Sequence, residues 1–212
     1  MKRPKTSRAW WLDRHVHDPF VKLAQKEGYR SRAAYKLLGL NERDHLLRPG
    51  MTVVDLGSAP GGWCQVVANI VGEKGRVVGI DLLPVESVRG VLLIQADFAA
   101  DEGLAQVEVA LEGRKVDLVL SDMAPNLSGV KEADQAKHYV LAELALEFAA
   151  QWLKPEGVLV VKVFHGQDFE AYVRLARQTF RQVHVRKPDA SRDESRENFL
   201  VGKGLKGASI NS

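Results

Sequence analysis

The chain has 212 residues, of which 45% are hydrophobic and 27% are charged, proportions that are ordinary for a globular protein. No apolar run approaches the ~20 residues of a membrane-spanning helix, and the single cysteine, Cys64, excludes an intrachain disulfide and fits a reducing cytoplasm. We therefore expect one domain: a basic helical extension over 1–48, a core over 49–204 and a tail over 205–212.

Positive charge is concentrated in the N-terminal quarter of the chain. Residues 1–48 hold twelve Lys or Arg against five Asp or Glu, a net +7 in a chain whose total is +3. This distribution favours a surface for a polyanion, and a solvated arm is the alternative. Trp10 and Trp11 lie among these cations, where they could stack on unpaired bases or pack the arm onto the body. No apolar segment follows the charged start, so a signal peptide is not expected.

Two short helices are predicted before the core. The first runs from Asp18-Pro19 to about Glu27, and Gly28 ends it. Ser31 is a candidate cap for the second helix. The apolar stripe of that second helix consists of Ala34, Leu37 and Leu38, with Lys36 beside it.

The core alternates between strand-like and helix-like patterns. Apolar runs predict strands over 52–56, 76–81, 91–96, 117–121, 158–164, 182–187 and 198–202. Helical periodicity predicts helices near 63–71, 101–113, 133–153 and 168–180. This alternation favours an α/β, Rossmann-like fold, a seven-stranded and mostly parallel sheet with helices on both faces. Only about ten residues separate the last two strands, too few for a crossover helix, so we expect the final strand to be antiparallel.

A glycine-rich turn follows the first core strand. The stretch reads Val53-Val54-Asp55-Leu56-Gly57-Ser58-Ala59-Pro60-Gly61-Gly62-Trp63, a buried strand, a turn and a helix start. Glycines let the backbone approach a ligand closely, as in nucleotide sites. The spacing is not G-x-G-x-x-G, and it is closer to the adenosylmethionine turn of methyltransferases.

Acidic residues stand at the ends of the next strands. Asp81 ends the second, 20 residues after Gly61, where a carboxylate can accept both ribose hydroxyls. Asp97 follows the third, where it could accept the amine of adenine, and Asp122 follows the fourth. For each residue taken alone, the alternative is an aspartate in a solvent-exposed turn. Because the carboxyl ends of parallel strands share one sheet edge, the set together favours a ligand site there.

Lys162 interrupts the apolar run Val158-Leu159-Val160-Val161-Lys162-Val163-Phe164. A buried, unpaired ammonium costs several kcal/mol, so this lysine must be paired or lose its proton, and buried lysines can serve as general bases. The alternative is a lysine whose amine reaches solvent. Lys36 and Glu197, taken singly, are expected to be surface charges. The histidines lack zinc-binding spacing, so no metal site is predicted.

Three motifs together resemble the FtsJ/RrmJ family of RNA ribose 2′-O-methyltransferases. They are Asp55-Leu56-Gly57-Ser58-Ala59-Pro60-Gly61-Gly62-Trp63, Ser121-Asp122-Met123-Ala124-Pro125-Asn126 and Val161-Lys162-Val163-Phe164. The segments Arg30-Ser31-Arg32-Ala33-Ala34-Tyr35-Lys36-Leu37 and Ser195-Arg196-Glu197 also resemble family motifs. The likeness extends over roughly residues 7–204. Ser58 departs from the alanine common in the family, and both residues are small.

The resemblance implies a class I methyltransferase fold with S-adenosylmethionine as the cofactor. It implies a catalytic Lys-Asp-Lys-Glu tetrad of Lys36, Asp122, Lys162 and Glu197, in which neutral Lys162 takes the proton of a ribose 2′-hydroxyl. The implied cofactor contacts are Gly57, Gly61, Trp63, Asp81, Asp97 and Asp122.

The compact length resembles bacterial members that methylate a uridine ribose in 23S rRNA of the large ribosomal subunit. A cytoplasmic monomer acting in ribosome biogenesis is therefore expected. The predicted RNA-binding residues are Arg30, Arg32, Lys22 and Lys26. Charge reversal at Arg30 and Arg32 is expected to weaken RNA binding and to leave cofactor binding intact.

Two other functions are considered. An amino-methyltransferase acting on a base or a protein often carries Asn-Pro-Pro-Tyr after the fourth strand, where this chain has Asp122-Met123-Ala124-Pro125. A ribosome-assembly factor could bind RNA and use the fold only as a scaffold, but a pure binder has no need of Lys162.

Overall fold

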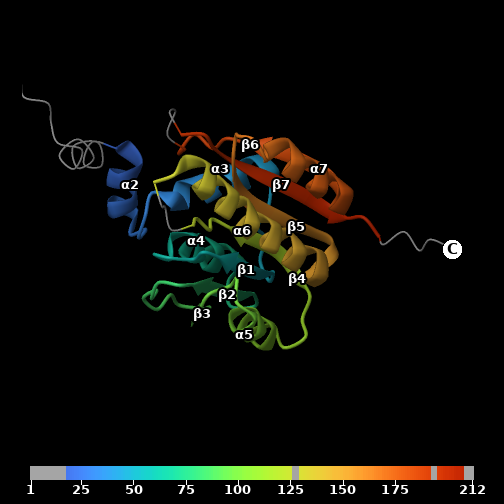
Figure 1. Ribbon diagram of the computed structural model, residues 1–212. Helices are drawn as coiled ribbons and strands as arrows, with labels where there is room; N and C mark the ends of the chain where they lie inside the picture. Colours follow the sequence, from blue (N-terminus) through green and yellow to red (C-terminus); the bar gives the residue numbers. More distant parts are fainter. Residues whose placement is uncertain (1–17, 126–128, 192–194, 208–212) are drawn as a thin grey trace, which may run out of the picture.

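The computed structural model describes residues 18–125, 129–191 and 195–207. Within them one sheet comprises β1 (Thr52–Leu56), β2 (Arg76–Asp81), β3 (Val91–Gln95), β4 (Val116–Ser121), β5 (Leu153–Phe164), β6 (Phe180–Arg186) and β7 (Glu197–Leu205). The order across the sheet is β3-β2-β1-β4-β5-β7-β6 (Figure 1). Strands β1 to β5 pair in parallel, and β7 is antiparallel to both β5 and β6. The predicted sheet and its antiparallel final strand are confirmed.

Helices cover both faces of this sheet. One face packs on α3 (Ala33–Asp44) and α4 (Gly62–Val71) through a cluster that includes Leu37, Trp63 and Phe199. The other packs on α5 (Asp101–Leu111), α6 (Lys131–Trp152) and α7 (Phe169–Thr179) through a second cluster. Strand β1 is buried at every residue, as its valine-rich sequence predicts. Along a strand successive side chains alternate between these two helical layers.

The two predicted N-terminal helices are present, but one cap prediction is wrong. Helix α2 (Pro19–Glu27) begins at Pro19, where Asp18 Oδ1 accepts from the amide of Phe20 at 3.0 Å, and Gly28 ends it with a φ of 77°. Helix α3 begins after Arg32 without a side-chain cap, and the hydroxyl of Ser31 is buried without a hydrogen-bond partner among the described residues. Ser31 Oγ would lie 2.7 Å from a Cβ built on Gly62, so the hydroxyl faces α4 rather than the start of α3.

An ion cluster joins the end of α3 to β6 and β7, the last two strands at one edge of the sheet. Asp44 accepts from Arg186 Nε at 2.9 Å and Nη2 at 3.1 Å, and Lys203 Nζ lies 3.2 Å from its Oδ1. Burial alone would raise the pKa of Asp44, but these hydrogen bonds outweigh it and lower the pKa. The cluster therefore ties α3, which carries Lys36, to β6 and β7.

Several element ends differ from the predicted ones. Strand β5 begins at Leu153 rather than 158, because the stretch after Leu153, exposed from Lys154 to Glu156, forms a register irregularity against β4 instead of a separate turn. Strand β7 extends to Leu205, and the amide of Lys206 still donates to Thr179 O at 2.9 Å. The predicted N-terminal arm with Trp10 and Trp11 lies outside the described residues, as does the end of the tail. No helix in the described part is long and apolar enough to cross a membrane.

Candidate functional site

The glycine-rich turn is held tightly against two neighbouring strands. The amides of Gly57 and Ser58 both donate to Ile80 O, at 2.9 and 3.1 Å. Gly57 has a φ of 81°, a conformation that L side chains rarely adopt. A Cβ added there would lie 2.9 Å from the backbone N and Cα of Met123. The turn therefore requires glycine at this position for both conformation and space.

A cleft of about 230 Å³ opens at the carboxyl ends of the strands beside this turn. Four predicted cofactor contacts line it together, namely Gly57, Asp81, Asp97 and Asp122. Apolar side chains that sequence reasoning did not single out complete the walls, among them Ile80, Leu82, Phe98, Met123 and Leu141. The acids could be recognised because they follow strand ends. Leu141 comes from the distant helix α6, and no local motif marks it as part of this site.

Gly61 and Trp63 do not line this cleft. Gly61, with a φ of 106°, is the N-terminal cap of α4. The indole of Trp63 is buried, donates to Ala33 O at 2.7 Å and packs on Phe199 with 5.6 Å between ring centroids. In this structure the Trp63 side chain joins α4 to α3 and β7.

The carboxylates of Asp81 and Asp97 are oriented by backbone amides. Asp81 accepts from Ala59 N and from Leu83 N, both at 2.8 Å. Asp97 Oδ1 accepts from Ala99 N at 2.9 Å. A carboxylate has about four acceptor positions, so both residues retain acceptor capacity for hydroxyl or amine groups of a ligand.

Lys162 lies in the middle of the sheet and is paired. Its side chain is 8% exposed, and Nζ lies 2.8 Å from Asp122 Oδ1 in an ion pair. It also donates to the backbone oxygen of Asp122 at 2.6 Å. Asp122 Oδ1 has no hydrogen bond of good geometry among the described residues, so the ion pair is close but poorly aligned. Of the two outcomes expected for this buried lysine, a partner or the loss of its proton, the structure shows a partner.

A second lysine and carboxylate pair lies on the same face of the sheet. Lys36 Nζ on α3 is 2.7 Å from Glu197 Oε1 at the start of β7, and both side chains are largely buried. Ser191 Oγ donates to the same carboxylate oxygen at 3.1 Å. Because Lys162 pairs with Phe199 across β5 and β7, Glu197 projects to the same side of the sheet as Lys162. Lys36 Nζ lies 5.8 Å from the centroid of the Phe199 ring, so that ring connects the two pairs.

A buried histidine on α6 makes a hydrogen bond to the backbone of Lys162. His138 Nε2 donates to Lys162 O at 3.0 Å, because a carbonyl oxygen can only accept. Burial, and then the charge of Lys162, lower the pKa of His138 to about 4. His138 is therefore neutral near pH 7 and adds no positive charge beside the lysine.

Asp55 in β1 is an acid buried beneath the glycine-rich turn. It is fully buried and accepts from Cys64 Sγ at 3.2 Å, while its Oδ1 has no partner among the described residues. Burial, with a smaller contribution from the charges of Asp122 and Asp81, raises the pKa of Asp55 to about 7 against a weaker lowering by the Cys64 hydrogen bond. The folded protein therefore keeps this carboxyl protonated to a higher pH than the unfolded chain does.

Replacing Asp55 with asparagine is expected to remove a pH-dependent loss of stability. The pKa is 3.8 ordinarily and about 7 when folded, so between these values the folded state binds more protons than the unfolded state. The free energy of unfolding of the wild type therefore falls as pH rises through this window, by about 3 kcal/mol. Urea unfolding at pH 4.5 and pH 8 should show that the free energy of unfolding of Asp55→Asn, relative to the wild type, is higher at pH 8 than at pH 4.5. An equal difference at both pH values would contradict this assignment.

The two arginines predicted to bind RNA make contacts within the chain. Arg30 Nη1 donates to Glu86 O at 2.6 Å and Pro60 O at 3.3 Å, and Nη2 donates to Ser87 O at 2.8 Å. Arg32 pairs with Asp18 at 3.0 Å and donates to the backbone oxygen of Ala190. Lys22 and Lys26 are exposed one turn apart on α2 and remain available to a polyanion.

Replacing Arg30 with alanine is expected to weaken cofactor binding about tenfold, which revises the expectation that cofactor binding is insensitive to this residue. Arg30 ties the segment after β2, where Leu82 and Leu83 line the cleft, to the glycine-rich turn. Loss of hydrogen bonds from a charged donor costs about 1.5 kcal/mol or more. Calorimetric titration with S-adenosylmethionine measures the effect.

The matched control is Arg89→Ala in the same segment, because the Arg89 side chain is 95% exposed and pairs only with the equally exposed Glu73 among the described residues. It should bind the cofactor as the wild type does. Unchanged cofactor affinity in Arg30→Ala together with weakened RNA binding would restore the original expectation.

The chain is similar to known methyltransferases over nearly its whole length. The sequence model of the FtsJ-like methyltransferases matches residues 29–205. A protein of Thiobacillus denitrificans named ribosomal RNA large subunit methyltransferase E is 57% identical over 202 residues, which cover 95% of this chain and 91% of the relative. A Marinobacter nauticus protein of the same name is 55% identical, covering 97% and 99%.

Two solved structures share the fold. A crystal structure from Plasmodium falciparum, assigned as a ribosomal RNA methyltransferase, superimposes with a TM-score of 0.74 at 29% identity, over 84% of this chain and 98% of that one. Fibrillarin of Aeropyrum pernix, solved with natively bound S-adenosyl-L-methionine, gives a TM-score of 0.59 at 17% identity, over 82% and 75%. The latter likeness extends to the fold alone.

Proposed function

The chain belongs to the FtsJ-like methyltransferase family, and from that premise we propose that it methylates the 2′-hydroxyl of a uridine ribose in 23S rRNA. The methyl donor is S-adenosylmethionine, and the protein acts on the large ribosomal subunit in the cytoplasm as a monomer. The observation that carries the proposal is the ion pair between Lys162 and Asp122, because Asp122 also lines the cofactor cleft. One residue thus joins the cofactor cleft to a buried lysine.

The names of the relatives support the choice of substrate. The proteins that are 57% and 55% identical over nearly the whole chain are named as methyltransferases of large-subunit ribosomal RNA. The ribose hydroxyl comes from the resemblance of the motifs to RNA ribose methyltransferases, and the uridine comes from the resemblance of the compact chain to the bacterial members. Exposed Lys22 and Lys26 on α2, within the basic N-terminal quarter, suit contacts to RNA phosphates.

The residues of the cleft fit S-adenosylmethionine. Asp81 and Asp97 offer acceptors suited to ribose hydroxyls and an adenine amine, and Phe98, Ile80 and Leu141 offer apolar walls. Gly57 lets the turn lie close against Met123, because a Cβ there would lie 2.9 Å from the Met123 backbone. When bound, the cofactor supplies a methyl group made electrophilic by a positively charged sulfur.

Lys162 serves as the general base in this proposal. The neutral amine would remove the proton of the 2′-hydroxyl, and the electron pair of that oxygen would form the bond to the methyl carbon while the bond from this carbon to the cofactor's sulfur breaks, its electron pair remaining on sulfur. Before that step the ammonium gives up a proton, and the Asp122 carboxylate at 2.8 Å is the nearest acceptor. The bond to Asp122 O, at 2.6 Å, fixes the position of the nitrogen during both steps.

Lys36 and Glu197 hold the ribose side of the site. Their ion pair at 2.7 Å is anchored on Ser191 and lies on the same sheet face as Lys162. An ammonium there can donate to the ribose, while Glu197 keeps that ammonium in place. An RNA-binding assembly factor would not need two lysine and carboxylate pairs beside a nucleoside cleft, which favours the enzyme.

Titration with S-adenosylmethionine and a methyl-transfer assay test the proposal. Large subunits from cells that lack the protein are incubated with the purified chain and with cofactor carrying a labelled methyl group. We expect saturable cofactor binding and label in 23S rRNA. Subunit binding without cofactor binding would instead support the assembly factor, and label in a protein or a base would support an amino-methyltransferase.

A further inference from the structure

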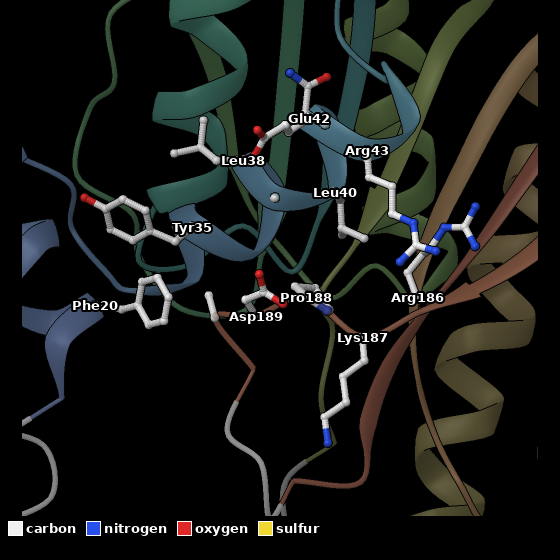
Figure 2. A pocket seen from close by; sticks show the side chains of 13 residues that line it. Phe20, Tyr35, Leu38, Leu40, Glu42, Arg43, Arg186, Lys187, Pro188 and Asp189 are labelled. Carbon is white, nitrogen blue, oxygen red and sulfur yellow. The ribbon is translucent and has the colours of Figure 1, made fainter.

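A second pocket lies outside the cofactor cleft and shares none of its lining residues. It has a volume of about 670 Å³ and lies between α2, α3 and the segment that follows β6. Figure 2 shows the side chains that line it, from Phe20 on α2 to Lys187 after β6. This volume is within the usual range for sites that bind small molecules or single nucleotides.

The pocket has an aromatic end and a cationic end. Phe20 and Tyr35 lie at one end with 5.6 Å between ring centroids, whereas Arg43 and Arg186 lie at the other (Figure 2), and Lys187 also lines the pocket. Arg186 is committed to Asp44, but Arg43 is exposed and has no ion-pair partner among the residues that the structure describes. Aromatic faces stack on unpaired bases, and exposed arginines bind phosphates.

The pocket adjoins the Lys36–Glu197 pair on two walls. Tyr35 lines the pocket and the next residue on α3 is Lys36. Ala190 also lines the pocket and the next residue is Ser191, whose hydroxyl donates to Glu197. Consecutive Cα atoms are about 3.8 Å apart, so the backbone that lines the pocket continues directly into the residues that form and hold the Lys36–Glu197 pair.

We propose that this pocket binds an unstacked nucleotide of the RNA, one that neighbours the methylated nucleotide, with its base against Phe20 and Tyr35 and its phosphate at Arg43. The inference rests on the proposed function, since it supposes an RNA substrate at the Lys36–Glu197 pair. Glu42 and Asp189 also line the pocket, and carboxylates repel phosphate but accept hydrogen bonds from base amines. They therefore favour a base rather than a phosphate in the middle of the pocket.

Two variants test the two ends of the pocket separately. Binding to large subunits from cells lacking the protein is measured without cofactor, at several salt concentrations. Phe20→Leu keeps an apolar side chain but loses the aromatic face, and should weaken binding about tenfold. Arg43→Gln should lower the slope of log affinity against log salt concentration by about one, as expected for one lost phosphate contact.

The control is Arg174→Gln on α7, an exposed arginine in the helical layer on the opposite face of the sheet, which should leave both affinity and slope unchanged. Thermal unfolding verifies that each variant is folded. If Phe20→Leu does not fold, the Arg43→Gln variant decides the test, because Arg43 is exposed. Wild-type affinity and slope in the folded variants would overturn the proposal. Because binding is measured without methyl transfer, a wild type that binds subunits but does not methylate them would count against the proposed function alone.

Discussion

Replacing Lys162 with methionine is expected to lower the rate of methyl transfer about 10³-fold without loss of cofactor binding. A positioned general base contributes roughly 10² to 10⁴ to a rate, and Lys162 is the only lysine among the described residues paired with an acid of the cleft. Methionine retains much of the stem volume inside the sheet. Single-turnover transfer to large subunits measures the rate, and calorimetry measures cofactor affinity.

Lys154→Met is the matched control for this prediction. Lys154 lies on the same strand, β5, and also pairs with an aspartate, Asp117, at 2.7 Å, but it is half exposed and lies outside the cofactor cleft. The control should transfer methyl groups at the wild-type rate. Turnover of Lys162→Met within a few-fold of the wild type would remove Lys162 from the role of base.

Replacing Gly57 with alanine is expected to weaken cofactor binding at least about 100-fold. The new Cβ would lie 2.9 Å from the backbone of Met123, so either the turn or the segment after β4 must shift. That segment begins with Asp122, which lines the cleft and pairs with Lys162. A 100-fold weaker affinity corresponds to a loss of about 2.7 kcal/mol in binding free energy. A cost of this size is typical of backbone strain together with a close contact.

Gly90→Ala separates backbone strain from the close contact. Gly90 has a φ of 78°, nearly that of Gly57, but a Cβ there meets nothing within 4 Å. It should lose about 1 kcal/mol of stability and keep its cofactor affinity. Equal affinities in the two variants would show that the approach of Gly57 to Met123 does not shape the cleft.

The central part of the fold follows directly from the sequence. Strands β1 and β2 match their predicted bounds, because valine-rich runs bounded by glycine have few alternatives to a buried strand. The grouping of Asp81, Asp97 and Asp122 also follows, since parallel strands place their carboxyl ends at one edge. Lys162 was recognisable because a charge inside an apolar strand requires a partner.

Contacts between distant segments were beyond sequence patterns. A basic segment indicates a polyanion partner, yet Arg30 and Arg32 bind backbone oxygens of segments up to 158 residues away in the chain. Backbone carbonyls are present at every residue, so no sequence signal marks those that accept from a guanidinium. Ser31 has the composition of a helix cap, but the packing of α3 on α4 places its hydroxyl against Gly62.

The account depends most directly on the identity of the methylated nucleoside. Large subunits from cells lacking the protein are incubated with the wild-type chain and S-adenosylmethionine, and the 23S rRNA is digested and analysed by mass spectrometry. We predict one new nucleoside, 2′-O-methyluridine, which is absent when Lys162→Met replaces the wild type. A methyl group on a base, or an equal yield of 2′-O-methyluridine from Lys162→Met, would contradict the account.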